Sequence, residues 1–181
     1  MKNRKKPAHL PNISRDNQSV ILFVTVCASR RNVNSFATAE MHEIVVRAWN
    51  NTRSYRVGGY VIMPDHIHLF CAPTLIEVEN AAMWVKYWKS LVSREIVMKR
   101  SDLSGGTSVT SSFSTSHKEA VEVELLDRES IFQRDCWDTQ LRRGESYHEK
   151  WLYVRNNPVR AGLAQNAEEW PYSGVIHDLR W

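Results

Sequence analysis

Cysteine is scarce in this chain of 181 residues, which has only Cys27, Cys71 and Cys136. The three are far apart and none belongs to a Cys-x-x-Cys pair. An odd number of widely spaced cysteines indicates neither a disulfide framework nor a zinc ribbon. We therefore expect reduced, buried thiols.

Long hydrophobic runs are also missing. Outside residues 20–28 the apolar stretches are only a few residues long, whereas a membrane-spanning helix needs about 20. The basic first residues are followed by no apolar segment and no small-residue cleavage site, which argues against a secretory signal. These absences predict a cytoplasmic protein with no membrane partner.

The positive charge is unevenly distributed along the chain. The net charge of +4 divides into +8 over residues 1–100, −4 over 101–130 and 0 over 131–181. A basic body is the electrostatic footprint expected of a protein that binds phosphate backbones. With 43% hydrophobic residues, the chain has enough apolar material for one ordinary domain, which we assign to 1–181.

Hydrophobic periodicity predicts the elements of this domain. Strands are expected at 20–28, 55–63, 66–72 and 131–141, and helices at 38–51, 77–99 and 145–156. Thr38 is a candidate N-cap, and Pro158 is expected to stop the last helix. Gly58 and Gly59 interrupt the second strand, which suggests a bulge or a close backbone approach.

The predicted order is strand, helix, strand, strand, helix, strand, helix. It indicates an α+β fold of the ferredoxin-like βαββαβ kind, an antiparallel sheet with helices on one face and a C-terminal helix. Residues 1–19 are expected to form a basic arm. The Ser-rich, acidic residues 101–130 are expected to form a flexible insertion.

The sharpest local feature is His66-Ile67-His68 on a predicted strand. Because side chains alternate along a strand, both imidazoles project from one face and can share one divalent metal ion. Two ordinary, half-exposed histidines are the alternative. The spacing therefore predicts a metal site that needs a third ligand from elsewhere.

The last predicted helix offers that ligand. Tyr153 and Asn157 are four residues apart and share one helix face. An amide oxygen beside two imidazoles suits Mg²⁺ or Mn²⁺, and a tyrosine beside such an ion is a potential nucleophile. A core-facing tyrosine and a C-capping asparagine remain the alternative. Tyr147 is a rival nucleophile, but no metal-ligand type lies four residues after it.

Four ordered motifs give the chain a wider resemblance. They are MPDHIHL at 63–69, WVKYWKSLVSR at 84–94, FQRDCWD at 132–138 and YVRNNPVRAG at 153–162, followed by the closing WPYS at 170–173. In this order they resemble the motifs of REP-associated tyrosine transposases. These are HUH endonucleases of the single-tyrosine transposase type, where HUH means His, hydrophobic, His. The resemblance spans roughly residues 20–175, and the longer, Ser-rich 101–130 segment departs from it.

The resemblance implies a function and a site. It implies a ferredoxin-like HUH fold in which His66 and His68 bind the metal and Tyr153 is the nucleophile. Asn157 takes the place of a third ligand that is Gln in related single-tyrosine transposases. The implied reaction is cleavage and transfer of single-stranded DNA through a 5′-phosphotyrosine. The implied target is a hairpin-forming repetitive extragenic palindrome, which suggests a nucleoid-associated monomer or homodimer.

Basic and aromatic side chains are candidates for contact with this DNA. Trp84, Trp88 and Trp137 can either stack on bases or pack in the core. The basic residues can either bind phosphates or remain solvated surface charges. The candidate phosphate contacts are Lys2, Arg4, Lys5, Lys6, Arg30, Arg31, Lys86, Lys89, Arg94, Arg134, Arg155 and Arg160.

Two other classes of function remain open. A rolling-circle replication initiator or relaxase shares the His-x-His and Tyr chemistry, but usually adds a helicase domain or a second catalytic tyrosine. A non-catalytic nucleic-acid-binding module of ferredoxin-like fold would not need the pairing of His66, His68, Tyr153 and Asn157. No Gly-x-x-x-x-Gly-Lys-[Ser/Thr] phosphate loop is present, which is consistent with a reaction that uses no nucleotide cofactor.

Overall fold

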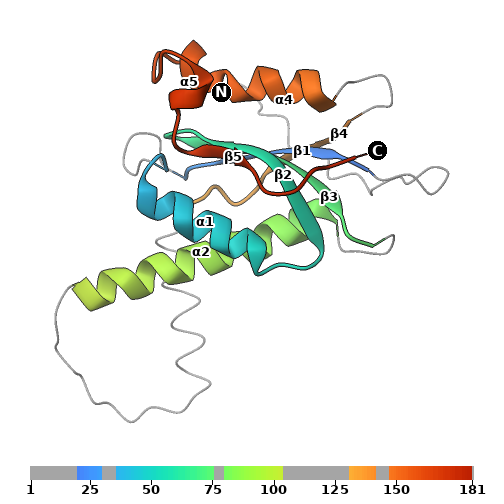
Figure 1. Cartoon of the computed structure of the whole chain (residues 1–181). Helices are drawn as coiled ribbons and strands as arrows, with labels where there is room; N and C mark the ends of the chain where they lie inside the picture. Colours follow the sequence, from blue (N-terminus) through green and yellow to red (C-terminus); the bar gives the residue numbers. More distant parts are fainter. Residues whose placement is uncertain (1–19, 30–35, 76–79, 104–130, 142–146, 181) are drawn as a thin grey trace, which may run out of the picture.

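A computed structural model describes residues 20–29, 36–75, 80–103, 131–141 and 147–180 (Figure 1). The expected arm at 1–19 and most of the expected insertion, 104–130, lie outside these residues. The elements are β1 (Leu22–Cys27), α1 (Ala39–Asn50), β2 (Tyr55–Ile62), β3 (His66–Pro73), α2 (Ala81–Leu103), β4 (Trp137–Gln140), α4 (Tyr147–Arg155), α5 (Asn157–Arg160), η1 (Ala167–Glu169) and β5 (Ser173–Val175).

One antiparallel sheet organises the described chain. Its strands lie in the order β4-β1-β3-β2-β5, and each neighbouring pair is antiparallel. The first four strands follow the order of the ferredoxin-like βαββαβ fold, so the predicted fold class is confirmed. The fifth strand was not predicted. It has only three residues, and a Cβ added at its Gly174 would lie 2.9 Å from the Tyr60 hydroxyl, so glycine lets this strand lie against Tyr60.

Helices α1 and α2 cover one face of the sheet (Figure 1). Thr38 caps α1 as predicted, since its Oγ1 accepts a hydrogen bond of 3.1 Å from the Met41 backbone N–H. Asn80 does the same for α2 through a 2.9 Å bond from the Met83 N–H, so that helix starts later than expected. It also ends later, because Leu103 is its last residue, inside the predicted insertion.

Helix α4, the predicted C-terminal helix, covers part of the opposite face (Figure 1). The physical reason is a second set of apolar side chains on the sheet. Val61, Phe70 and Ala72 are buried there with Val154 of α4, while Tyr147 and Trp151 pack against them. A sheet that is apolar on both faces needs cover on both.

Two glycines let α4 approach β2 closely. The β2–β3 register shifts between Val57 and Tyr60, which confirms the bulge predicted at Gly58 and Gly59. The Gly59 N–H donates a 3.0 Å hydrogen bond to the Tyr147 hydroxyl. A Cβ added at Gly59 would lie 2.6 Å from the Trp151 ring, and one at Gly58 would lie 2.7 Å from the Tyr147 hydroxyl. The bulge is therefore the part of β2 against which α4 packs.

Pro158 does not stop the last helix in the expected way. α4 ends at Arg155, and Pro158 lies in the first turn of α5, where its missing N–H leaves no intrahelical hydrogen bond unmade. Asn157 is the first residue of α5 rather than the last of α4. The Asn156 side chain donates a 2.9 Å bond to the Leu152 carbonyl across the break between the two helices.

Two predicted absences can be compared with the described residues. All three cysteines are free, with Cys71 and Cys136 buried and Cys27 partly exposed. No helix among the described residues has both the length and the apolar character needed to cross a membrane.

We expect Gly59→Ala to destabilise the fold by about 1–3 kcal/mol, because the new methyl group collides with the Trp151 ring. Urea denaturation measures this loss. In a Trp151→Ala background the same substitution should cost much less, since the collision is gone. An equal loss of unfolding free energy in both backgrounds would contradict the close packing of Trp151 against Gly59.

Candidate active site

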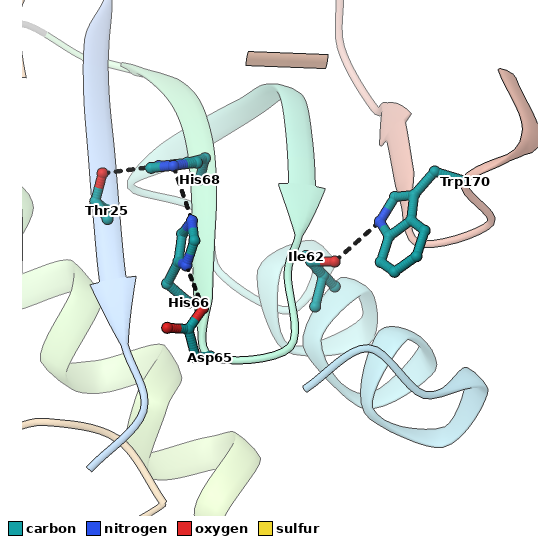
Figure 2. Close-up of polar contacts among 6 residues, drawn as sticks. All are labelled: Thr25, Ile62, Asp65, His66, His68 and Trp170. Atoms are coloured by element: carbon teal, nitrogen blue, oxygen red, sulfur yellow. Dashed lines mark hydrogen bonds and ion pairs between the residues drawn. The ribbon is translucent and has the colours of Figure 1, made fainter. Parts of the chain in front are cut away.

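His66 and His68 begin β3 and project from the sheet face that α4 partly covers. Their intervening residue, Ile67, is buried on the other face with α1 and α2. The two Nε2 atoms lie 3.1 Å apart (Figure 2). Ligand nitrogens about 2.1 Å from one metal ion at roughly a right angle would be about 3 Å apart. The strand thus brings two donor atoms to the separation that one cation requires.

Both imidazoles have a polar partner at Nδ1, the ring nitrogen opposite the one that would bind a metal ion (Figure 2). His66 Nδ1 lies 2.6 Å from an Asp65 carboxylate oxygen, and His68 Nδ1 lies 2.9 Å from the Thr25 hydroxyl. A carboxylate on Nδ1 leaves the His66 Nε2 lone pair free, and a hydroxyl can donate or accept as His68 requires. Each histidine therefore has an outer partner that fixes its ring.

The sequence analysis missed both outer partners. Asp65 adjoins the His-x-His motif in MPDHIHL, so its position was a usable signal. Thr25 lies 43 residues away and reaches His68 only because β1 pairs with β3 in a register that aligns the two residues. No local sequence pattern predicts which residues of β1 and β3 are aligned.

His68 is held in its neutral form by its surroundings. Burial, followed by the repulsion from His66, lowers the pKa of His68 from 6.5 to about 4, while Asp65 partly opposes the shift. The Phe23 ring stacks on the imidazole at a centroid distance of 5.2 Å. A neutral imidazole is the form that can bind a metal ion.

The histidine pair supplies only part of a metal site. No group of three His, Cys, Asp or Glu side chains that could hold an ion occurs among the described residues. The two imidazoles therefore fit a cation whose other ligands are of another kind, such as an amide, water or a phosphate oxygen.

Tyr153 points outward from α4. The sheet-facing side chains of this helix are Tyr147, Trp151 and Val154, whereas Tyr153 is 60% exposed. The guanidinium of Arg160 lies over its ring, 4.3 Å from the centroid. No hydrogen bond or ring contact joins Tyr153 to either histidine in the part of the chain that the structure describes. A site shared by Tyr153 and the two histidines stays a prediction.

The end of α4 is nevertheless connected to the histidine end of the sheet. Val154 belongs to the same buried cluster as Val61 and Met63, and the Met63 N–H donates a 2.8 Å bond to the His66 carbonyl. Trp170 of the WPYS motif donates from Nε1 to the Ile62 carbonyl at 3.1 Å (Figure 2). The chain that follows α5 is therefore tied to β2 one residue before Met63.

Asn157 and Tyr153 both contact the side chain of Arg160. Its Oδ1 accepts a 3.5 Å hydrogen bond from Arg160 Nη1, the same guanidinium that covers the Tyr153 ring. The break before α5 has kept the two residues within reach of one arginine. The capping role considered for Asn157 belongs to its neighbour Asn156.

The rival tyrosine, Tyr147, has a structural role in packing α4 against the sheet. Its hydroxyl accepts the Gly59 N–H, and its ring packs edge-on against Phe70 at 5.1 Å. Burial raises the pKa of Tyr147, although the hydrogen bond from Gly59 opposes the shift. A half-buried phenol whose ionisation is disfavoured is a poor nucleophile.

The candidate phosphate contacts fall into groups. Lys2, Arg4, Lys5, Lys6, Arg30 and Arg31 lie outside the described residues. Lys86 and Arg94 are exposed on α2, on the face of the sheet away from the histidines. Arg134 is exposed just before β4, and Arg155 forms a 3.0 Å ion pair with Glu168. Arg160 is the candidate that contacts Tyr153.

Lys89 has a structural role instead. Its side chain is only 8% exposed, and its Nζ donates to the carbonyls of Gln133 and Arg134 at 2.8 and 3.0 Å. Trp84 and Trp88 are likewise fully buried, in the core beneath α1. The buried position of Lys89 corrects its assignment as a phosphate contact, and of the two alternatives left open for Trp84 and Trp88 the structure shows core packing.

Comparison with known proteins agrees with the motifs. No protein-family model matches the chain. A Haemophilus influenzae protein named provisionally as a REP-associated tyrosine transposase is 24% identical over 119 residues, which are 66% of this chain. A solved structure described as a REP-associated tyrosine transposase bound to a REP hairpin matches with a TM-score of 0.61. The resemblance to REP-associated tyrosine transposases is confirmed.

The extent of these matches differs. The chain spans 58% of the length of the Haemophilus influenzae protein. The solved REP-associated transposase is covered over 81% of its length by 94% of this chain, at 14% identity, so that likeness concerns the fold. The shared fold is the antiparallel sheet with helices described above.

We expect the free energy of unfolding to decrease as the pH falls from 6.5 towards 4, because of the lowered pKa of His68. Above pH 6.5 its imidazole is neutral in both the folded and the unfolded chain. As the pH falls from 6.5 towards 4, the unfolded chain takes up a proton that the folded chain excludes, so the free energy of unfolding decreases. Urea denaturation in the presence of a chelator should show a weaker pH dependence for His68→Gln. Identical slopes for variant and wild type would refute the shift.

Proposed function

We propose that this protein is a metal-dependent endonuclease and strand transferase of single-stranded DNA that works through a 5′-phosphotyrosine. The observation that carries the proposal is the His66 and His68 pair, whose Nε2 atoms face each other at 3.1 Å while Asp65 and Thr25 hold the opposite nitrogens. An exposed tyrosine on the adjacent helix and the likeness to REP-associated tyrosine transposases support it.

In this proposal His66 and His68 hold one divalent cation, with Asn157 as the third protein ligand. Asn157 would have to release Arg160 to take that role. When bound, Mg²⁺ or Mn²⁺ supplies charge neutralisation at a non-bridging oxygen of the scissile phosphate. Asp65 and Thr25 keep the imidazole rings in the orientation that presents Nε2.

Tyr153 is the proposed nucleophile. Its hydroxyl oxygen forms a bond to phosphorus, the bond from phosphorus to the 3′ oxygen breaks, and the phenolic proton is balanced by protonation of the departing 3′ oxygen. The Arg160 guanidinium lies over the ring and is positioned to meet a phosphate. The reaction leaves a 5′-phosphotyrosine and a free 3′-OH.

Strand transfer follows by reversing the same step. The phosphotyrosine keeps the free energy of the phosphodiester, so a 3′-OH can attack it and reseal the strand. No nucleotide hydrolysis is needed, which fits the missing phosphate loop. A rolling-circle initiator or relaxase would use the same chemistry, but the ordered motifs agree with those of the single-tyrosine transposases.

The proposed substrate is a hairpin-forming repetitive extragenic palindrome. The similar solved structure holds a REP-associated tyrosine transposase bound to a REP hairpin, so a hairpin of this kind is the ligand of that protein. The cleaved strand must be unpaired at the scissile phosphate, because one small domain cannot otherwise bring that phosphate to half-buried histidines. With this substrate the protein would act at the nucleoid.

A pair of matched substitutions tests the nucleophile. With Mn²⁺ and a single-stranded hairpin oligonucleotide, Tyr153→Phe should abolish the covalent DNA adduct seen on a denaturing gel, because only the attacking oxygen is lost. DNA affinity should stay near that of wild type, since arginines and lysines make the phosphate contacts. A non-catalytic binding module would form no adduct even as wild type.

Tyr147→Phe is the control on the same helix. It should keep adduct formation and lose about 0.5–1.5 kcal/mol of stability, because the Gly59 N–H loses its acceptor. Adduct formation by the Tyr153 variant together with its loss in the Tyr147 variant would reverse the assignment.

A second experiment tests the metal site without DNA. Titration calorimetry with Mn²⁺ should show one site in wild type and none in His66→Ala. Asp65→Asn should weaken the affinity by about 10- to 100-fold, because the His66 ring loses its outer partner. Glu95→Gln removes an equal charge on the opposite face, where it pairs with Arg47, and should change nothing. Unchanged affinity in both histidine and Asp65 variants would exclude this site.

A further inference from the structure

Trp137 lies in the same cross-strand row as the histidine site. It is the first residue of β4, the edge strand, and its partner on β1 is Thr25. Thr25 is in turn aligned with His68 on β3 and donates or accepts the hydrogen bond to its Nδ1. Directly paired residues of antiparallel strands carry their side chains on the same face. Trp137, Thr25 and His68 therefore share the face of the proposed site.

Independent observations agree with this placement. Asp138, the next residue of β4, pairs with the buried Val24 and interacts with Cys71, which lies beneath α1 and α2. Side chains alternate along a strand, so Trp137 must lie on the opposite face. Its backbone is two strand spacings from His68, about 10 Å.

Trp137 is also exposed in an unusual way. Among the tryptophans that the structure describes, Trp49, Trp84 and Trp88 are buried in the core, whereas Trp137 is 49% exposed. Its neighbours on this face include Thr25 in the row, the exposed Thr139 further along β4, and Phe23, which pairs with Thr139 and stacks on the His68 ring. The indole therefore extends the aromatic surface beside His68 towards solvent at the edge of the sheet.

We propose that Trp137 is a stacking platform for an unpaired nucleobase next to the scissile phosphate. This rests on the proposed function, since it needs a DNA strand at the histidines. A flat aromatic ring half in solvent stacks on a base with little sequence preference. The platform holds the cleaved strand in register with His66 and His68.

The test compares three variants on DNA hairpins with a short single-stranded tail. Binding is measured by fluorescence anisotropy, with the tail either intact or carrying one abasic site at successive positions. Trp137→Ala should bind the intact DNA about 10- to 100-fold more weakly than wild type, the usual loss of one stacked base. Trp137→Phe should recover most of the affinity. Thr139→Ala, on the same strand and face, should bind as wild type does.

The abasic series identifies the contact itself. At one tail position the abasic site should weaken wild type as much as Trp137→Ala does and should not weaken that variant further. A 2-aminopurine base at this position should be quenched on binding to wild type and not to the alanine variant. Circular dichroism confirms that the variants are folded.

Other results would overturn the proposal in separable ways. Wild type that binds no hairpin would refute the proposed function and the platform together. Wild type that binds while Trp137→Ala binds equally well would refute the platform alone. An equal loss in Thr139→Ala, or an abasic effect that persists in Trp137→Ala, would also refute it, because neither depends on the indole.

Discussion

The close approach of α4 to the Gly58–Gly59 bulge determines how the second face of the sheet is used. Tyr147 and Trp151 can reach β2 only because neither glycine carries a Cβ. Their rings cover Phe70, in the second half of β3, whereas His66 and His68 lie at its start and are half-buried. The packing of α4 against the Gly58–Gly59 bulge therefore determines which part of the second hydrophobic cluster this helix covers.

The same contact separates the roles of two tyrosines on one helix. Tyr147 faces inward and its hydroxyl is used by the Gly59 N–H, so its chemistry is suppressed. Tyr153 faces outward, where solvent and Arg160 are its surroundings. At about 100° per residue, the six positions between them turn the two side chains about 120° apart around the helix, one towards the sheet and one towards solvent. The exposed Tyr153 is the one that can meet a substrate, and the half-buried Tyr147 keeps the helix in place.

Local patterns predicted much of this structure, and long-range pairing accounts for what they missed. The spacing of His66 and His68 was enough to place them on one face, and Thr38 was recognisable as a cap from its neighbours alone. By contrast, Thr25 and His68 are 43 residues apart, and Gly59 and Tyr147 are 88 apart. The short β5 has too few residues for any periodicity, and its pairing depends on Tyr60 packing over Gly174.

The open part of the sheet combines features that a purely structural surface would avoid. Half-buried His68 is kept neutral at the cost of losing its charged form, and its Nε2 faces another imidazole instead of a good donor. Trp137 remains half exposed in the same row, although burial of its ring would be favourable. An apolar helix extended over this region would bury the indole, but it would also deprive both imidazoles of access to polar ligands. Under the proposed function, these costs in stability leave a surface where a cation, a phosphate and a flat base would be bound together.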